Sequence, residues 1–162
     1  MSSKTLTRSA ADYEADFYAW TQDQAEKLRA RRANEIDWEN VGEEIESLGG
    51  SQKSEIRNRL RVLLHHLLKW EFQPDRRCHS WQSTIGEQRI HIEGLIDDSP
   101  SLKRFPGEVL DWVYERAVRF AASETRLPIS TFPSACPYSI DAILDPTFMP
   151  GPPWHPDDLI GD

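Results

Sequence analysis

The sequence lacks the features that place a protein outside the cell or in a membrane. It has two cysteines, Cys78 and Cys136, and no CxxC pair, which excludes a disulfide framework and suits a reducing compartment. Its longest apolar cluster, residues 62–68, contains two histidines and is too short to span a bilayer. The N-terminus has no apolar signal core. These absences predict a cytoplasmic protein that does not associate with membranes.

The chain also lacks the excess of positive charge that nucleic-acid-binding proteins need. Its net charge is −8 and its pI is about 5.1, which argues against a nucleic-acid partner. One basic stretch is the exception, and it keeps nucleic-acid association as the weakest alternative. Acidic residues interrupt this stretch, so we interpret it as a solvated helix face that pairs with acidic neighbours. Its members are Lys53, Arg57, Arg59, Arg61, Lys69, Arg76 and Arg77.

No catalytic motif is present. The sequence contains no glycine-rich phosphate loop, no zinc-ligand spacing and no G-x-S-x-G elbow. Cys78 has Arg77 and His79 as neighbours, which could lower the pKa of its thiol, but no recognisable signature surrounds it. We therefore expect no metal and no cofactor, and the sequence favours a non-enzymatic protein.

What is present indicates an all-α single domain over residues 1–162. Of the 162 residues, 38% are hydrophobic and six are tryptophan, enough to build one buried core. Apolar residues recur at helical spacing across residues 12–125, and no strand-like alternation persists. We expect a bundle of about five helices, in which Asp37 and Ser51 cap the second and third and Gly49-Gly50 ends the second. The expected ranges are 12–32, 37–49, 51–72, 80–98 and 106–125.

Residues 126–162 form a segment of a different kind. Eight of the eleven prolines lie at or beyond Pro128, so a long helix cannot form there. One turn is expected over residues 139–144. The segment is nevertheless too apolar for a free linker, and we predict a proline-rich cover packed on the bundle. Its large apolar residues are Phe132, Tyr138, Ile140, Ile143, Leu144, Phe148 and Trp154.

Six motifs, in order along nearly the whole chain, resemble a bacterial family known as domain of unknown function 29. They are YEADFYAW, LRARRANEIDWENVGEEIESLG, HLLKWEFQP, SWQSTIGEQR, DDSPSLK and FPSACPYSIDAILDPTFMP, which begin at residues 13, 28, 66, 80, 97 and 132. The resemblance implies an all-helical bundle. It implies no activity and gives no catalytic residues to transfer.

Four residues are candidates for a polar binding site: Glu44, His66, Trp70 and Arg89. Glu44 lies beside an apolar helix stripe, and His66 lies one turn before Trp70, so a carboxylate and a histidine on facing helices define a possible crevice. The Glu-x-x-His motifs of carboxylate-bridged metal sites are missing. Arg89 falls on an apolar helix face, and a charge there must be paired or reach the surface. We expect an ion pair with Glu71, and the alternative is a ligand carboxylate held by Arg89.

Three functions remain in contention. The first is a non-enzymatic helical module that binds another protein or a second copy of itself. The second is a small metal- or ligand-binding enzyme that uses the Glu44–His66 crevice. The third is a nucleic-acid-associated protein that uses the basic stretch. Exposure of Trp38 or Trp154, which lie among polar residues and prolines, would indicate a partner surface.

Overall fold

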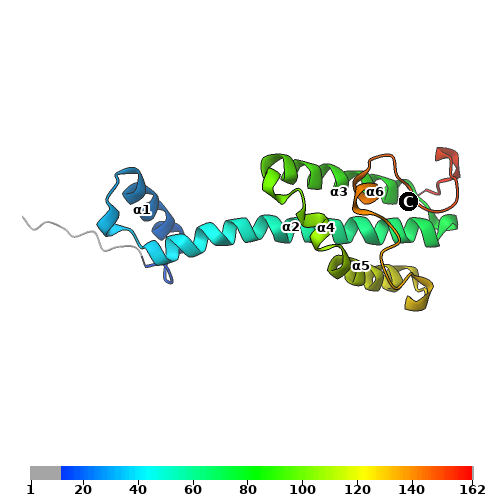
Figure 1. Ribbon diagram of the computed structural model, residues 1–162, viewed down its shortest axis with the longest axis horizontal. Coiled ribbons are helices and arrows are strands. Elements are labelled where there is room, and N and C mark those ends of the chain that lie inside the picture. Colours follow the sequence, from blue (N-terminus) through cyan, green and yellow to red (C-terminus); the bar gives the residue numbers. More distant parts are fainter. Residues whose placement is uncertain (1–11, 162) are drawn as a thin grey trace, which may run out of the picture. The chain divides into compact units, whose positions relative to one another are not determined.

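The computed structural model describes residues 12–161, and these residues form six α-helices and no strand. The all-α class expected from the sequence is therefore confirmed. A single isolated bridge, between Cys78 and Ile160, is the only β-type pairing in the described part of the chain. The contacts divide the chain into two compact units, Met1–Gly50 and Ser51–Asp162, and each unit is drawn with its elements in Figure 1.

The first unit contains helix α1, Phe17–Arg29, and a 3-10 turn, Ala33–Glu35. The carboxylate of Asp16 caps α1 by accepting from the amide of Ala19 at 2.9 Å, so the helix begins later than the expected residue 12. Trp20 is buried, its indole donates to Asp37 at 3.3 Å, and the ring of Tyr13 meets it edge-on at 4.9 Å. These contacts connect the segment before α1 with the segment after it.

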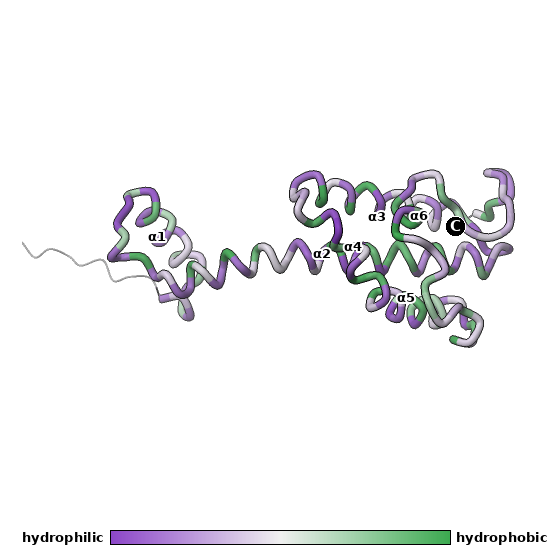
Figure 2. The backbone as a smooth tube through the Cα atoms, viewed as in Figure 1, coloured by the Kyte–Doolittle hydropathy of each residue, from purple (hydrophilic) through white to green (hydrophobic). Residues whose placement is uncertain are grey.

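Helix α2, Trp38–Phe72, is one continuous helix of 35 residues, where the sequence predicted two helices separated by Gly49-Gly50. Asp37 does accept from the amide of Asn40 at the start, but Ser51 lies inside the helix and caps nothing. Glycine permits a left-handed C-cap without imposing it, and each added helical residue gains a backbone hydrogen bond without a new nucleation step. Figure 2 shows polar and apolar residues alternating with the helical turn along α2.

In the second unit, α3, His79–Asp98, and α5, Leu110–Thr125, flank the second part of α2 (Figure 1). A short helix α4, Phe105–Glu108, precedes α5, so the fifth helix expected from residue 106 is broken at Val109. The 3-10 turns Pro74–Arg76 and Pro100–Leu102 border α3. Leucines of α2 fill the core with residues from both neighbours: Leu60, Leu63, Leu64, Leu67, Leu68, Ile85, Ile92, Val113 and Ala117.

The basic stretch of α2 is engaged within this unit. Lys53, Arg57 and Arg61 lie one turn apart, and each stacks on an aromatic ring of α4 or α5, namely Phe105, Trp112 and Phe120, with cation-to-centroid distances of 5.2, 5.5 and 4.0 Å. The guanidinium of Arg59 is 2.6 Å from Glu55. The acidic neighbours predicted from the sequence are found for Arg59 and Lys69, whereas Lys53, Arg57 and Arg61 contact aromatic rings, which the sequence did not indicate.

The proline-rich segment packs on the second unit, as predicted from its composition. Phe132, Tyr138 and Ile143 are buried, and the segment forms the 3-10 turns Ile129–Thr131 and Pro156–Asp158 and the short helix α6, Ile140–Leu144, capped by Ser139. Its carbonyl groups have few backbone donors to pair with, because proline has no N–H. Near the C-terminal end of the segment, the buried side chain of Arg77 supplies the missing donors. Its guanidinium donates to the carbonyls of Pro150 and Pro152 at 3.4 and 2.9 Å.

The chain reverses close to the end of α2 at Gly151, and here a side chain would not fit. Gly151 has φ of +85°, and a Cβ atom at this position would lie 3.0 Å from the guanidinium of Arg77 and 3.1 Å from the Cα atom of Glu71. Both the left-handed backbone and the close approach require glycine.

Candidate binding surfaces

The first candidate surface is an apolar strip on the part of α2 that belongs to the first unit. It consists of Trp38, Val41, Ile45 and Leu48. We call it the acidic stripe, because the segment that carries these apolar residues is rich in carboxylates. Their spacings of three, four and three residues place them on one face of the helix. Trp38, Ile45 and Leu48 are 59%, 64% and 70% exposed. Four apolar side chains in helical register, three of them in solvent, form a continuous surface and differ from scattered exposed residues, which are ordinary.

The helix segment that carries this stripe is acidic, and two of its carboxylates, Asp37 and Glu44, flank the stripe, each one position before a stripe residue. From Asp37 to Gln52 there are five acidic residues and no lysine or arginine: Asp37, Glu39, Glu43, Glu44 and Glu46. Two of them are fixed by neighbours in the first unit. Asp37 accepts from the side-chain amide of Asn40 at 2.7 Å, and Glu44 accepts from the hydroxyl of Tyr13 at 2.6 Å. The hydrogen bond to Glu44 raises the pKa of Tyr13 to about 12, so the tyrosine stays a neutral donor.

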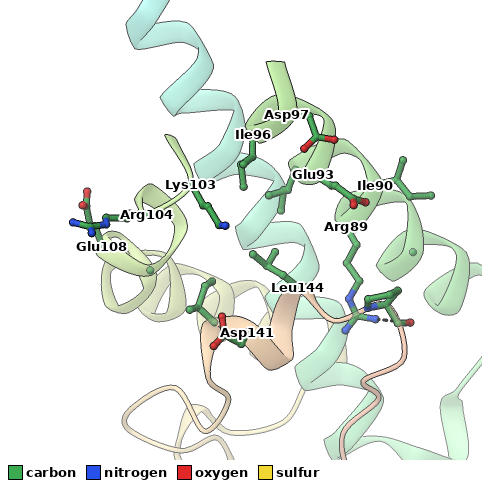
Figure 3. A pocket seen from close by; sticks show the side chains of 15 residues that line it. Arg89, Ile90, Glu93, Ile96, Asp97, Lys103, Arg104, Glu108, Asp141 and Leu144 are labelled. Atoms are coloured by element: carbon green, nitrogen blue, oxygen red, sulfur yellow. Dashed lines mark hydrogen bonds between the residues drawn. The ribbon is translucent and has the colours of Figure 1, made fainter. Parts of the chain in front are cut away.

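The second candidate surface is a groove in the second unit, between α3, α4 and α6, with a volume of about 710 Å³. Ile92, Ile96, Ile140 and Leu144 give it an apolar floor. Figure 3 shows Lys103 extending into the groove, with carboxylates of α3 and α6 at its edges. The volume is in the range of sites for drug-sized ligands, roughly 300–1,000 Å³. The rim carries Glu93, Asp97, Lys103, Arg104, Glu108 and Asp141.

Arg89 forms the inner wall of this groove and also fixes the proline-rich segment. Its guanidinium donates to the carbonyls of Ile143, Phe148 and Pro146 at 2.8, 2.8 and 3.5 Å, and the side chain is buried. Burial lowers the pKa of Arg89, and the carboxylate of Asp145 acts in the opposite direction. The arginine therefore shapes one wall of the groove by positioning α6.

The predicted Glu71–Arg89 ion pair does not form. Arg89 donates to backbone carbonyls, and Glu71 instead accepts from the hydroxyl of Tyr138. Burial raises the pKa of Tyr138, and the hydrogen bond to Glu71 adds to the effect. The sequence indicated correctly that Arg89 needs partners inside the protein. It could not indicate that a proline-rich segment more than fifty residues away supplies them as carbonyls.

A third polar feature lies between α2 and α5 and joins the buried side chains of His65 and Lys69 to the exposed carboxylate of Glu124. His65 and Lys69 approach the same carboxylate oxygen of Glu124, at 3.2 and 2.6 Å. The ring of His66 lies 4.2 Å from the ring of His65, and Lys69 lies over Trp81 at 4.3 Å. Burial, with contributions from His66 and Lys69, lowers the pKa of His65 to about 4, against the opposing effect of Glu124. None of these groups lines the groove.

The four predicted site residues do not form one crevice. Glu44 and His66 both belong to α2, in different units, so the facing-helix arrangement that we expected is not what the chain forms. His66 pairs with the carbonyl of Val62 at 2.8 Å. Trp70 is fully buried and meets the ring of Trp154 edge-on at 5.1 Å. Of the four, Arg89 alone lines the groove.

Within residues 12–161, no three histidine, cysteine, aspartate or glutamate side chains gather as ligands for a metal ion. No helix in the same range has the length and apolar character needed to cross a bilayer.

Residues 13–149 match the model of a family described as a domain of unknown function, DUF29. The chain belongs to this family. The matched range includes the acidic stripe and every residue of the groove, so both surfaces lie within the family domain. Neither the curated proteins nor the solved structures contain a match to the chain.

Sequence reasoning overlooked the acidic stripe as a surface. It identified Val41, Ile45 and Leu48 as the apolar stripe of a helix and did not single that stripe out as a binding surface. The signal that could have corrected this was local charge, because five carboxylates and no cation within sixteen residues disfavour burial. Trp38 was singled out as a residue whose exposure would matter, and it is exposed.

Proposed function

We propose that this chain is a non-enzymatic, protein-binding module of the DUF29 family and that the acidic stripe is its docking surface. The supporting observation is the exposure of Trp38, Ile45 and Leu48 on one helix face. Tryptophan is enriched among the residues that dominate binding energies at protein interfaces. Burial of a large apolar side chain contributes roughly 1.5–3 kcal/mol of free energy. A partner that covers this face would gain that contribution for each side chain it buries.

The arrangement of titratable groups supports a binding role over a catalytic one. His65 and Lys69 are buried, and both pair with Glu124, whose side chain is 45% exposed. A general base needs hydrogen-bond access to a substrate, and these side chains are not among the residues of the groove. We assign the cluster a role in stability. We also place the protein in the cytoplasm, a proposal supported by its two free cysteines.

Site-specific photo-crosslinking in the native host tests the docking surface. Benzoylphenylalanine replaces Ile45, which is on the stripe, or Glu43, which is exposed two positions earlier and points about 200° away around the helix. We expect a discrete adduct with another protein from position 45 and none from position 43. Equal adducts from both positions, or none from either, would count against the proposal.

The groove supports a second candidate function, binding of a small apolar molecule, because its volume and apolar floor suit one. Two glycines of α3 allow a matched test. Gly86 lines the groove and Gly94 does not, and a Cβ atom at either position would meet nothing within 4 Å. We expect Gly86→Leu to weaken binding of a fluorescent apolar probe and Gly94→Leu to leave it unchanged. Equal binding by both variants would remove the groove as a ligand site.

A further inference from the structure

Both units are acidic, and the unit that bears the acidic stripe has the larger net charge. Residues 1–50 include eleven aspartates and glutamates and six lysines and arginines, a net charge of −5, compared with −3 for residues 51–162. Four of these six cations are on α1 or just after it: Lys27, Arg29, Arg31 and Arg32. The stripe and its surroundings, residues 37–52, have none. The charged residues that flank the stripe, Asp37 and Glu44, are therefore both carboxylates.

The helix geometry of the stripe resembles one half of a coiled-coil seam. Trp38 and Ile45 are seven residues apart, Val41 and Leu48 repeat the same interval, and the two pairs alternate as the a and d positions of two heptads do. Gly42 and Gly49 directly follow the two d positions. A Cβ atom on either glycine would meet nothing within 4 Å, so the space beside the seam is open to a second helix.

Resting on the proposed function, we propose that the partner segment is a single amphipathic helix whose apolar face is flanked by lysine and arginine. Its apolar side chains would pack between Trp38, Ile45 and Leu48, and its cations would face the surrounding carboxylates. Charge excludes the simplest alternative, a second copy pairing stripe to stripe, because like-charged faces repel when they are brought together. A basic helix turns the same carboxylates into a source of attraction and of selectivity.

Three synthetic peptides of about three heptads test the chemistry of the partner without its identity. The first has leucine at a and d and lysine at e and g, the second has glutamate in place of lysine, and the third is a scrambled version of the first. With the full-length protein, we expect the first peptide to bind at least tenfold more tightly than either control, a difference of about 1.4 kcal/mol. Raising the ionic strength from about 0.05 M to about 0.5 M should weaken its binding, because salt screens exposed charges.

Matched variants locate the binding. Ile45→Gln removes an apolar contact from the stripe without changing charge, and Ile129→Gln removes a similarly exposed isoleucine, 58% in solvent, from the second unit. We expect at least tenfold weaker peptide binding for the first variant and unchanged binding for the second. Equal affinity for the lysine and glutamate peptides, or equal effects of the two variants, would overturn the proposal.

Sedimentation velocity and mass spectrometry separate the remaining outcomes. A dimer of the wild-type protein that Ile45→Gln converts to monomer would identify a second copy as the occupant and overturn the inference. If position 45 cross-links to a partner segment that is acidic or not amphipathic, the protein-binding function stands and the basic-helix inference fails. If position 45 yields no adduct, the proposed function itself fails.

Discussion

Acidification should destabilise this protein through His65, because the buried ring resists protonation. The side chain is 5% exposed, and its pKa lies at about 4 instead of the ordinary 6.5. Below pH 6.5 the unfolded chain takes up a proton at this position and the folded protein does not, so unfolding becomes more favourable as the pH falls. The stability that neutral His65 provides is complete above pH 6.5 and is lost progressively down to about pH 4.

The size of the effect follows from the pKa difference. A shift of one unit corresponds to about 1.36 kcal/mol, so the full loss at His65 is about 3 kcal/mol, and about 2.5 kcal/mol of it should be reached at pH 4.5. Burial also lowers the pKa of the adjacent His66, which acts in the same direction. Glutamine at position 65 retains an N–H donor for Glu124 and does not titrate. On unfolding at acidic pH, His65→Gln should therefore take up one proton fewer than the wild type.

Urea unfolding followed by tryptophan fluorescence at pH 7.5, 6.5, 5.5 and 4.5 measures this dependence. Over this range, the wild type should lose about 2.5 kcal/mol more free energy of unfolding than His65→Gln. His91 lies on α3 with an exposed side chain, and His91→Gln should follow the wild type. If His65→Gln and His91→Gln lose stability in parallel, the buried ring does not control the acid sensitivity.

Four further substitutions test the fold, and one of them, Arg104→Met, is a control. Arg89→Met should lower the free energy of unfolding by about 3 kcal/mol and increase proteolysis at the proline-rich segment, because three carbonyls lose their donor. Arg104→Met, at the exposed rim of the groove, should change both quantities little. Gly50→Ala should raise the free energy of unfolding by about 1 kcal/mol, because alanine favours a helix interior and its Cβ meets nothing. Gly151→Ala should lower it by more than about 1 kcal/mol, through the left-handed φ and the contact with Glu71. Urea midpoints test all four variants, and a stabilising Gly151→Ala would refute the account of that turn.

Local patterning was enough to predict the fold class and most helices. The apolar spacing predicted α3, which is expected at 80–98 and observed at His79–Asp98, and the proline content predicted an irregular cover with one turn at α6. These features depend on neighbours in sequence, which periodicity and φ restriction describe. The predicted helix break at Gly49-Gly50 was wrong. The preference of glycine for helix ends is a local effect, and the backbone hydrogen bonds gained by continuing the helix outweigh it.

The candidate surfaces were harder to predict, because the same pattern can be buried or exposed. The apolar residues of α2 before Gly50 and after Ser51 share the same helical spacing, yet Ile45 and Leu48 are exposed whereas Ile56 and Leu60 are fully buried. What differs is the presence of covering helices, which a sequence pattern does not specify. Likewise, Glu44 and His66 were expected on facing helices, and the continuity of α2 alone removed that possibility.

Composition and short-range periodicity are enough to specify an all-helical, acidic protein with a leucine core and an apolar, proline-rich C-terminal segment. In these properties each residue acts mainly through its own propensity and its near neighbours. Three features depend instead on the folded arrangement: Arg89 holds carbonyls of the proline-rich segment and not Glu71, cations of α2 stack on aromatic rings, and the acidic stripe is exposed. Each of these depends on which residues distant in sequence meet in space, and a buried charge accepts whichever satisfying partner the packing brings to it.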